Sequence, residues 1–123
     1  MLRFVSLYDE AGRPVGFEAS GHAGDAAKGG NLACAAASAL IQTLVDGLSG
    51  EMGLTLSLTT GKDGFLSCLV QGVPDQAVQD KMELLLRVVG RGLESIAEMD
   101  RTKSTVVLRE RRREVTRSME NGT

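Results

Sequence analysis

The chain is poor in aromatic residues: among its 123 residues there is no Trp, one Tyr and three Phe. Its core must therefore be built from aliphatic side chains. Hydrophobic residues make up 42% of the chain and charged residues 24%, which is typical of a soluble globular protein. A second domain would leave neither half enough apolar surface for a core, so we expect a single domain.

Long apolar runs are absent too. No segment has eighteen consecutive apolar residues, so we expect no membrane span. Residues 1–5 alternate like a strand and lack the apolar run and small-residue cleavage site of a signal peptide. These features predict a cytoplasmic protein.

Metal-ligating residues are scarce. The two cysteines, Cys34 and Cys68, are expected to remain reduced thiols. With a single His and no CxxC or HxxxH spacing, the chain cannot form a closed four-ligand zinc site without carboxylates. We therefore expect no structural metal and no cofactor.

The formal net charge is only −2, which argues against a whole-surface nucleic-acid binder. Residues 109–117 carry five Arg and two Glu, but no aromatic residue accompanies them for base stacking. We interpret this stretch as a solvated end and expect no direct nucleic-acid binding. The predicted division is a domain over residues 1–109 and a basic, flexible tail over residues 110–123.

The hydrophobic periodicity predicts an α+β fold: a single two-layer domain in the order β-β-α-β-β-α-β, with a mostly antiparallel sheet and two helices. Gly90 and Gly92 lie inside the second predicted helix, where glycine costs about 1 kcal/mol relative to Ala, so we expect close packing to require both. The predicted strands cover residues 2–8, 15–20, 54–59, 65–70 and 105–108, and the predicted helices cover residues 31–48 and 74–99.

The start of the first predicted helix places a thiol in a reactive environment. If Asn31 is the N-cap, Cys34 is the third helical residue, among unpaired N–H groups at the positive end of the helix dipole. That position favours a thiolate. His22 follows the second predicted strand and could act as the base, while helix-start N–H groups could hold an oxyanion. On spacing alone, a buried structural Cys34 and a surface His22 remain open alternatives.

The residues around this pair resemble a known family. Residues 21–24 read Gly-His-Ala-Gly, and after a glycine-containing loop residues 34–40 read Cys-Ala-Ala-Ala-Ser-Ala-Leu. This pattern resembles the ribosomal-processing cysteine proteases called Prp. Only residues 21–40 carry the specific motif, although the predicted order of strands and helices also fits that family.

The resemblance implies a cysteine endopeptidase with Cys34 as nucleophile and His22 as general base, and with Gly21, Asn31 and Ser38 beside them. It implies a substrate, the N-terminal extension of a large-subunit ribosomal protein, whose removal supports ribosome assembly. It also implies a homodimer. The family has Asp three residues before the nucleophile, where this chain has Asn31. Asn still caps a helix and can orient an imidazole through its amide oxygen, but without a charge.

Two alternatives come from other classes. One is a non-catalytic, ribosome-associated binding module that uses the Arg-rich tail. The other is a thiol-dependent hydrolase or acyltransferase that acts on a small substrate.

Overall fold

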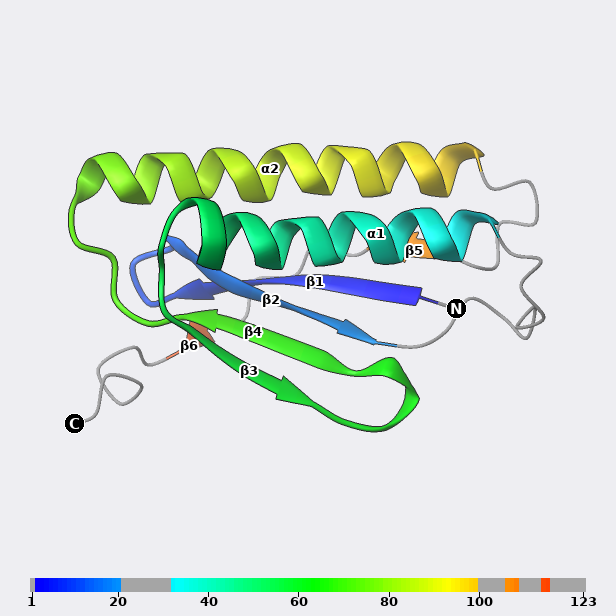
Figure 1. Ribbon diagram of the computed structural model, residues 1–123, viewed down its shortest axis with the longest axis horizontal. Helices are drawn as coiled ribbons and strands as arrows, with labels where there is room; N and C mark the ends of the chain where they lie inside the picture. Colours follow the sequence, from blue (N-terminus) through cyan, green and yellow to red (C-terminus); the bar gives the residue numbers. More distant parts are fainter. Residues whose placement is uncertain (1, 21–31, 100–105, 109–113, 116–123) are drawn as a thin grey trace.

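The computed structural model describes residues 2–20, 32–99, 106–108 and 114–115. The elements in chain order are β1 (Leu2–Asp9), β2 (Pro14–Ser20), α1 (Leu32–Asp46), the π-helical turn η2 (Gly47–Glu51), β3 (Leu56–Thr60), the short 3₁₀ turn η3 (Lys62–Gly64), β4 (Leu66–Val70), α2 (Gln76–Met99), β5 (Val106–Leu108) and β6 (Glu114–Val115). Both long helices lie on one side of the sheet, roughly parallel to the strands (Figure 1). The predicted two-layer α+β fold is confirmed.

The sheet has the strand order β3-β4-β2-β1-β5, and β6 also pairs with β1. The first four strands are antiparallel, whereas β5 and β6 run parallel to β1. The strand β6 was not predicted, and it lies within residues 110–123, which we expected to form a tail. The domain boundary at residue 109 stays a prediction. The sheet is therefore mostly antiparallel, as expected, with a parallel edge.

The core lies between the sheet and the helices. Phe4 of β1 stacks on Phe17 of β2, with ring centroids 5.3 Å apart. The remaining core is aliphatic, as the shortage of aromatic residues requires. Its other buried members are Leu2, Ala19, Ala37, Ile41, Leu44, Leu48, Leu54, Cys68, Val70, Met82, Val89 and Leu93.

One helical stretch, Leu32–Glu51, is long and apolar enough to cross a membrane by length and composition alone. That test is weak, because the core helix of a soluble protein also passes it. Ala37, Ile41 and Leu44 of this stretch are buried in the core that the helix shares with the sheet. We therefore interpret α1 as a core helix.

The glycines of α2 differ in what surrounds them. A Cβ at Gly92 would lie 2.8 Å from Cδ1 of Leu40 on α1, so the two helices approach closely there, as predicted. A Cβ at Gly90 would meet nothing within 4 Å. The prediction that packing requires Gly90 is therefore wrong, because this position faces open space rather than another element.

Leucine alternates with Thr and Ser over residues 54–59, a pattern that favours a strand with one buried face, but the strand β3 is mostly exposed. Leu54 precedes the strand, and Leu58 is 51% exposed. The reason is topological: β3 is the edge strand of the sheet and extends beyond the face that the helices cover (Figure 1).

Close contact between the two central antiparallel strands depends on Gly16. It pairs with Leu69 across the β2–β4 ladder, and a Cβ at this position would collide with the main-chain carbonyl of Cys68. Backbone atoms cannot move aside as a flexible side chain can. Gly16 therefore permits the close approach of β2 to β4 at this position.

Replacing Gly16 by Ala should lower the free energy of unfolding by about 2 kcal/mol or more, because the added methyl group forces β2 away from β4. The matched control is Gly90→Ala, whose added methyl group meets open space. This control should raise stability by up to about 1 kcal/mol through helix propensity. Urea denaturation of both variants measures the difference, and equal stabilities would contradict the role of Gly16.

Candidate active site

Cys34 is the third residue of α1, which begins at Leu32 as the predicted N-cap requires. Its side chain is half-buried, neither exposed like Leu32 nor enclosed like Ala37. Cys34 therefore borders the buried side of α1 rather than lying inside it. A thiol at this position can be reached from solvent while its backbone is held by a packed helix.

Ser38 lies one turn after Cys34 and is exposed. Residues four apart share a helix face, so the hydroxyl and the thiol lie on the same side of α1. Ala37 and Ile41 turn the adjoining face of the helix into the core. The apolar side of α1 therefore fixes which way the Cys34–Ser38 side points.

Three of the predicted site residues, Gly21, His22 and Asn31, lie outside the described residues. The segments on either side of them are described: β2 ends at Ser20 and α1 begins at Leu32. The strand β2 runs toward the end of the molecule at which α1 begins (Figure 1). The end of β2 and the first turn of α1, which carries the thiol, therefore lie toward the same end of the molecule.

The first turn of α1 offers an electropositive environment. It contains no acidic side chain, and the N–H groups of a first helical turn have no partner within the helix. These groups and the helix dipole together attract negative charge. The helix start can accordingly stabilise a thiolate, or the oxyanion of a tetrahedral intermediate.

The second cysteine lies in the opposite environment. Cys68 sits in the middle of β4, between Phe17 on β2 and Leu58 on β3, and is fully buried. Burial raises the pKa of the Cys68 thiol to about 11. This thiol stays protonated at neutral pH, and neither cysteine forms a disulfide.

Within the described residues, no group of three or more His, Cys, Asp or Glu side chains is placed to hold a metal ion.

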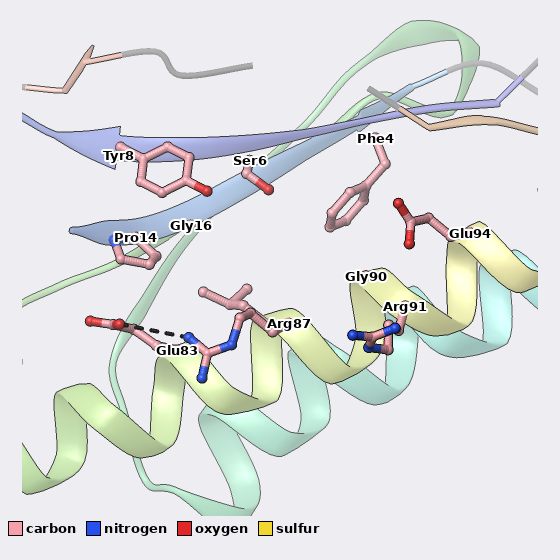
Figure 2. Close-up of a pocket in the computed structure, with 11 residues that line it drawn as sticks. Phe4, Ser6, Tyr8, Pro14, Gly16, Glu83, Arg87, Gly90, Arg91 and Glu94 are labelled. Carbon is pink, nitrogen blue, oxygen red and sulfur yellow. Dashed lines mark ion pairs between the residues drawn. The ribbon is translucent and has the colours of Figure 1, made fainter. Parts of the chain in front are cut away.

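A pocket between β1 and α2 contains charged residues that the sequence did not single out. Arg87 and Arg91 come from α2, and Ser6 and Tyr8 come from β1 (Figure 2). The spacing of the two Arg residues, one helical turn apart, could have shown that they share a face. Which strand lies opposite them could not be read from the sequence.

The fold is shared with solved protease structures. A ribosomal-processing protease Prp from S. aureus, solved with a covalently linked product peptide, is 18% identical, with a TM-score of 0.69 over 92% of this chain and 100% of that chain. The protein SMU.848 from Streptococcus mutans has a TM-score of 0.69 at 24% identity, over 92% of this chain and 96% of that one. The S. aureus protease with a substrate peptide is also similar, with a TM-score of 0.64, 18% identity and the same coverage as its product complex. At these identities the likeness establishes the fold, which this chain shares with the S. aureus protease.

Sequence comparison identifies the family. No curated protein matches the chain in sequence. The profile of the family described as cysteine protease Prp matches residues 1–104. The chain therefore belongs to the Prp family of cysteine proteases, and the resemblance seen in its motif is confirmed.

The two thiols should react differently with iodoacetamide. At about pH 8 the native protein should take up one carbamidomethyl group, on Cys34, because Cys68 is buried and protonated. The Cys34→Ala variant should take up none until it is unfolded, after which Cys68 reacts. Peptide mapping by mass spectrometry identifies the modified residue. Modification of Cys68 in the native protein would contradict this assignment.

Proposed function

We propose that this protease removes the N-terminal extension of a large-subunit ribosomal protein, with Cys34 as the nucleophile and His22 as the general base. The observation that carries the proposal is the position of Cys34: a half-exposed thiol in the first turn of a packed helix, in a chain of the Prp family. The S. aureus neighbours are described as ribosomal-processing proteases with peptide bound, which supports the substrate class.

The proposed reaction passes through an acyl-enzyme. His22 accepts the Cys34 proton, and the thiolate attacks the scissile carbonyl to form a C–S bond, while N–H groups at the start of α1 hold the oxyanion. The tetrahedral intermediate collapses, the C–N bond breaks, and the His22 imidazolium protonates the leaving amine. Water then attacks the thioester and gives a proton to His22. The C–S bond breaks, and the sulfur regains its proton.

The remaining predicted site residues have supporting roles. We assign Asn31 to cap α1 and to orient the His22 imidazole through its amide oxygen. Gly21 matches a family position that recurs beside the general base, and Ser38 shares the exposed side of α1 with the nucleophile. We place the reaction in the cytoplasm, where the proposed substrate is made. No cofactor enters the mechanism.

Cleavage of a peptide that copies the extension and its junction tests the proposal. Cys34→Ala should lower kcat/KM at least about a thousandfold, and His22→Ala should lower it by about 10²–10⁴, because each removes a group that acts in the chemical step. Cys68→Ala is the thiol control and should retain activity once its fold is verified by circular dichroism. Product formation is measured by chromatography and mass spectrometry.

Two outcomes would overturn the proposal. Cleavage that survives Cys34→Ala would remove Cys34 from the mechanism. A wild-type protein that does not cleave the peptide, but binds RNA tightly and in a salt-sensitive manner, would favour the non-catalytic binding module.

We also propose that the protease is a homodimer, joined through an apolar groove between η2 and α2. Leu84 and Val88 of α2 are more than half exposed, at 54% and 58%, and line a cavity of about 360 Å³. Glu51 and Lys81 stand at the same groove with opposite charges. A self-complementary interface lets Lys81 of one copy pair with Glu51 of the other, so we propose a second copy as the occupant.

Leu84→Glu should shift the protein from dimer to monomer, because it places an unpaired charge in an apolar interface. The matched control is Leu58→Glu, which changes an equally exposed leucine on the edge strand β3 and should leave the dimer intact. Light scattering after gel filtration measures the mass. Dissociation by Leu58→Glu but not by Leu84→Glu would place the interface elsewhere.

A further inference from the structure

A pocket with a cavity volume of about 240 Å³ lies between β1 and α2, which we call the β1–α2 pocket. Side chains of β1 and α2 face each other across it (Figure 2). None of its residues belongs to the proposed catalytic set. The residues that line it are Phe4, Ser6, Tyr8, Pro14, Gly16, Glu83, Leu86, Arg87, Gly90, Arg91 and Glu94.

The charged wall of the pocket is a single stripe along α2. Arg87 and Arg91 are one turn apart, so two positive charges lie side by side on the same face, an arrangement that destabilises an isolated helix. Arg91 forms no ion pair with the described part of the chain, and Arg87 reaches Glu83 only at 4.0 Å. An anion placed between the two guanidinium groups would relieve this repulsion.

A chain of polar contacts positions Glu83 at one end of the wall. Gln79 is buried, and its side-chain amide donates to the carbonyl of Pro14 at 3.4 Å and to Oε2 of Glu83 at 2.9 Å. The other carboxylate oxygen of Glu83 faces the guanidinium of Arg87 (Figure 2). Glu83 is therefore tied to β2 through a buried amide, while Arg87 stays largely exposed at the pocket.

The floor of the pocket contains a glycine that packing does not require. Gly90 lies in the interior of α2, where glycine is unfavourable, yet a Cβ there would meet nothing within 4 Å. Glycine at such a position leaves room for a ligand to approach the backbone closely. Gly90 lines the same pocket as Arg87 and Arg91, so its open space belongs to the cavity that the two positive charges border.

From these features we infer that the β1–α2 pocket binds a small organic oxyanion, with its carboxylate or phosphate group held between Arg87 and Arg91. Guanidinium groups match both oxyanions through paired hydrogen bonds, and the Ser6 hydroxyl on the facing strand can add another. The volume exceeds that of a bare ion, so the ligand carries a small body beside Phe4 and Leu86.

The carboxylates at the two ends of the stripe restrict the class of ligand. Glu83 and Glu94 flank the two arginines, so the four charges of the wall sum to zero. A polyanion such as RNA would meet repulsion at both ends of the stripe. A compact ligand with one anionic group avoids this repulsion. Hydrogen-bond donors next to that group can donate to the carboxylates of Glu83 and Glu94.

Isothermal titration calorimetry of the full chain with two probes, inorganic phosphate and N-acetylaspartate, tests the inference. At least one probe should bind saturably at fixed ionic strength. Arg87→Gln and Arg91→Gln should each weaken that binding about tenfold or more, because each removes a charge-assisted hydrogen bond. Gly90→Leu should abolish it by filling the floor of the pocket, and circular dichroism verifies that α2 is intact.

The control is Lys62→Gln, which removes one exposed positive charge from η3, outside both the pocket and the proposed dimer groove, and should leave affinity unchanged. Binding of phosphate alone identifies a phosphoryl ligand, and binding of N-acetylaspartate alone identifies a carboxylate ligand. Binding of neither probe, or an equal loss in Lys62→Gln and the arginine variants, would overturn the inference. The titration reads binding directly, so its outcome is independent of the proteolytic activity.

Discussion

The rest of the structure depends on the packing of the apolar side of α1 against the central strands. Ala37 and Leu44 are fully buried in the core cluster that also contains Phe17 of β2 and Cys68 of β4. A helix held in this way has little freedom to rotate. The adjoining side, with half-buried Cys34 and exposed Ser38, is therefore held at the border of the core, at the end toward which β2 runs.

The same packing separates the two thiols by environment. Cys34 lies where a helix begins and the backbone N–H groups lack partners, which is suitable for holding negative charge. Cys68 lies in the sheet under the helices, where desolvation disfavours its charged form. The sheet therefore does more than stabilise the fold. It buries the Cys68 thiol and leaves only the Cys34 thiol able to react.

The helix α2 has three distinct faces. Gly92 contacts α1, Met82 and Leu93 fill the core, and Arg87 and Arg91 face the space above β1. The face that holds the charges is the one that neither α1 nor the sheet fully covers. The β1–α2 pocket results from this incomplete coverage, and Gly90 enlarges it.

The sequence by itself determined the order of the elements, the start of α1 and the motif that identified the family, because periodicity, capping and short motifs are local properties of the chain. It did not determine that Leu58 is exposed, that Gly90 faces open space or that Glu114–Val115 pairs with β1. Nor could it place Arg87 and Arg91 opposite β1. Each of these depends on which element lies opposite a residue, and only the tertiary structure decides that, because the neighbours come from distant parts of the chain.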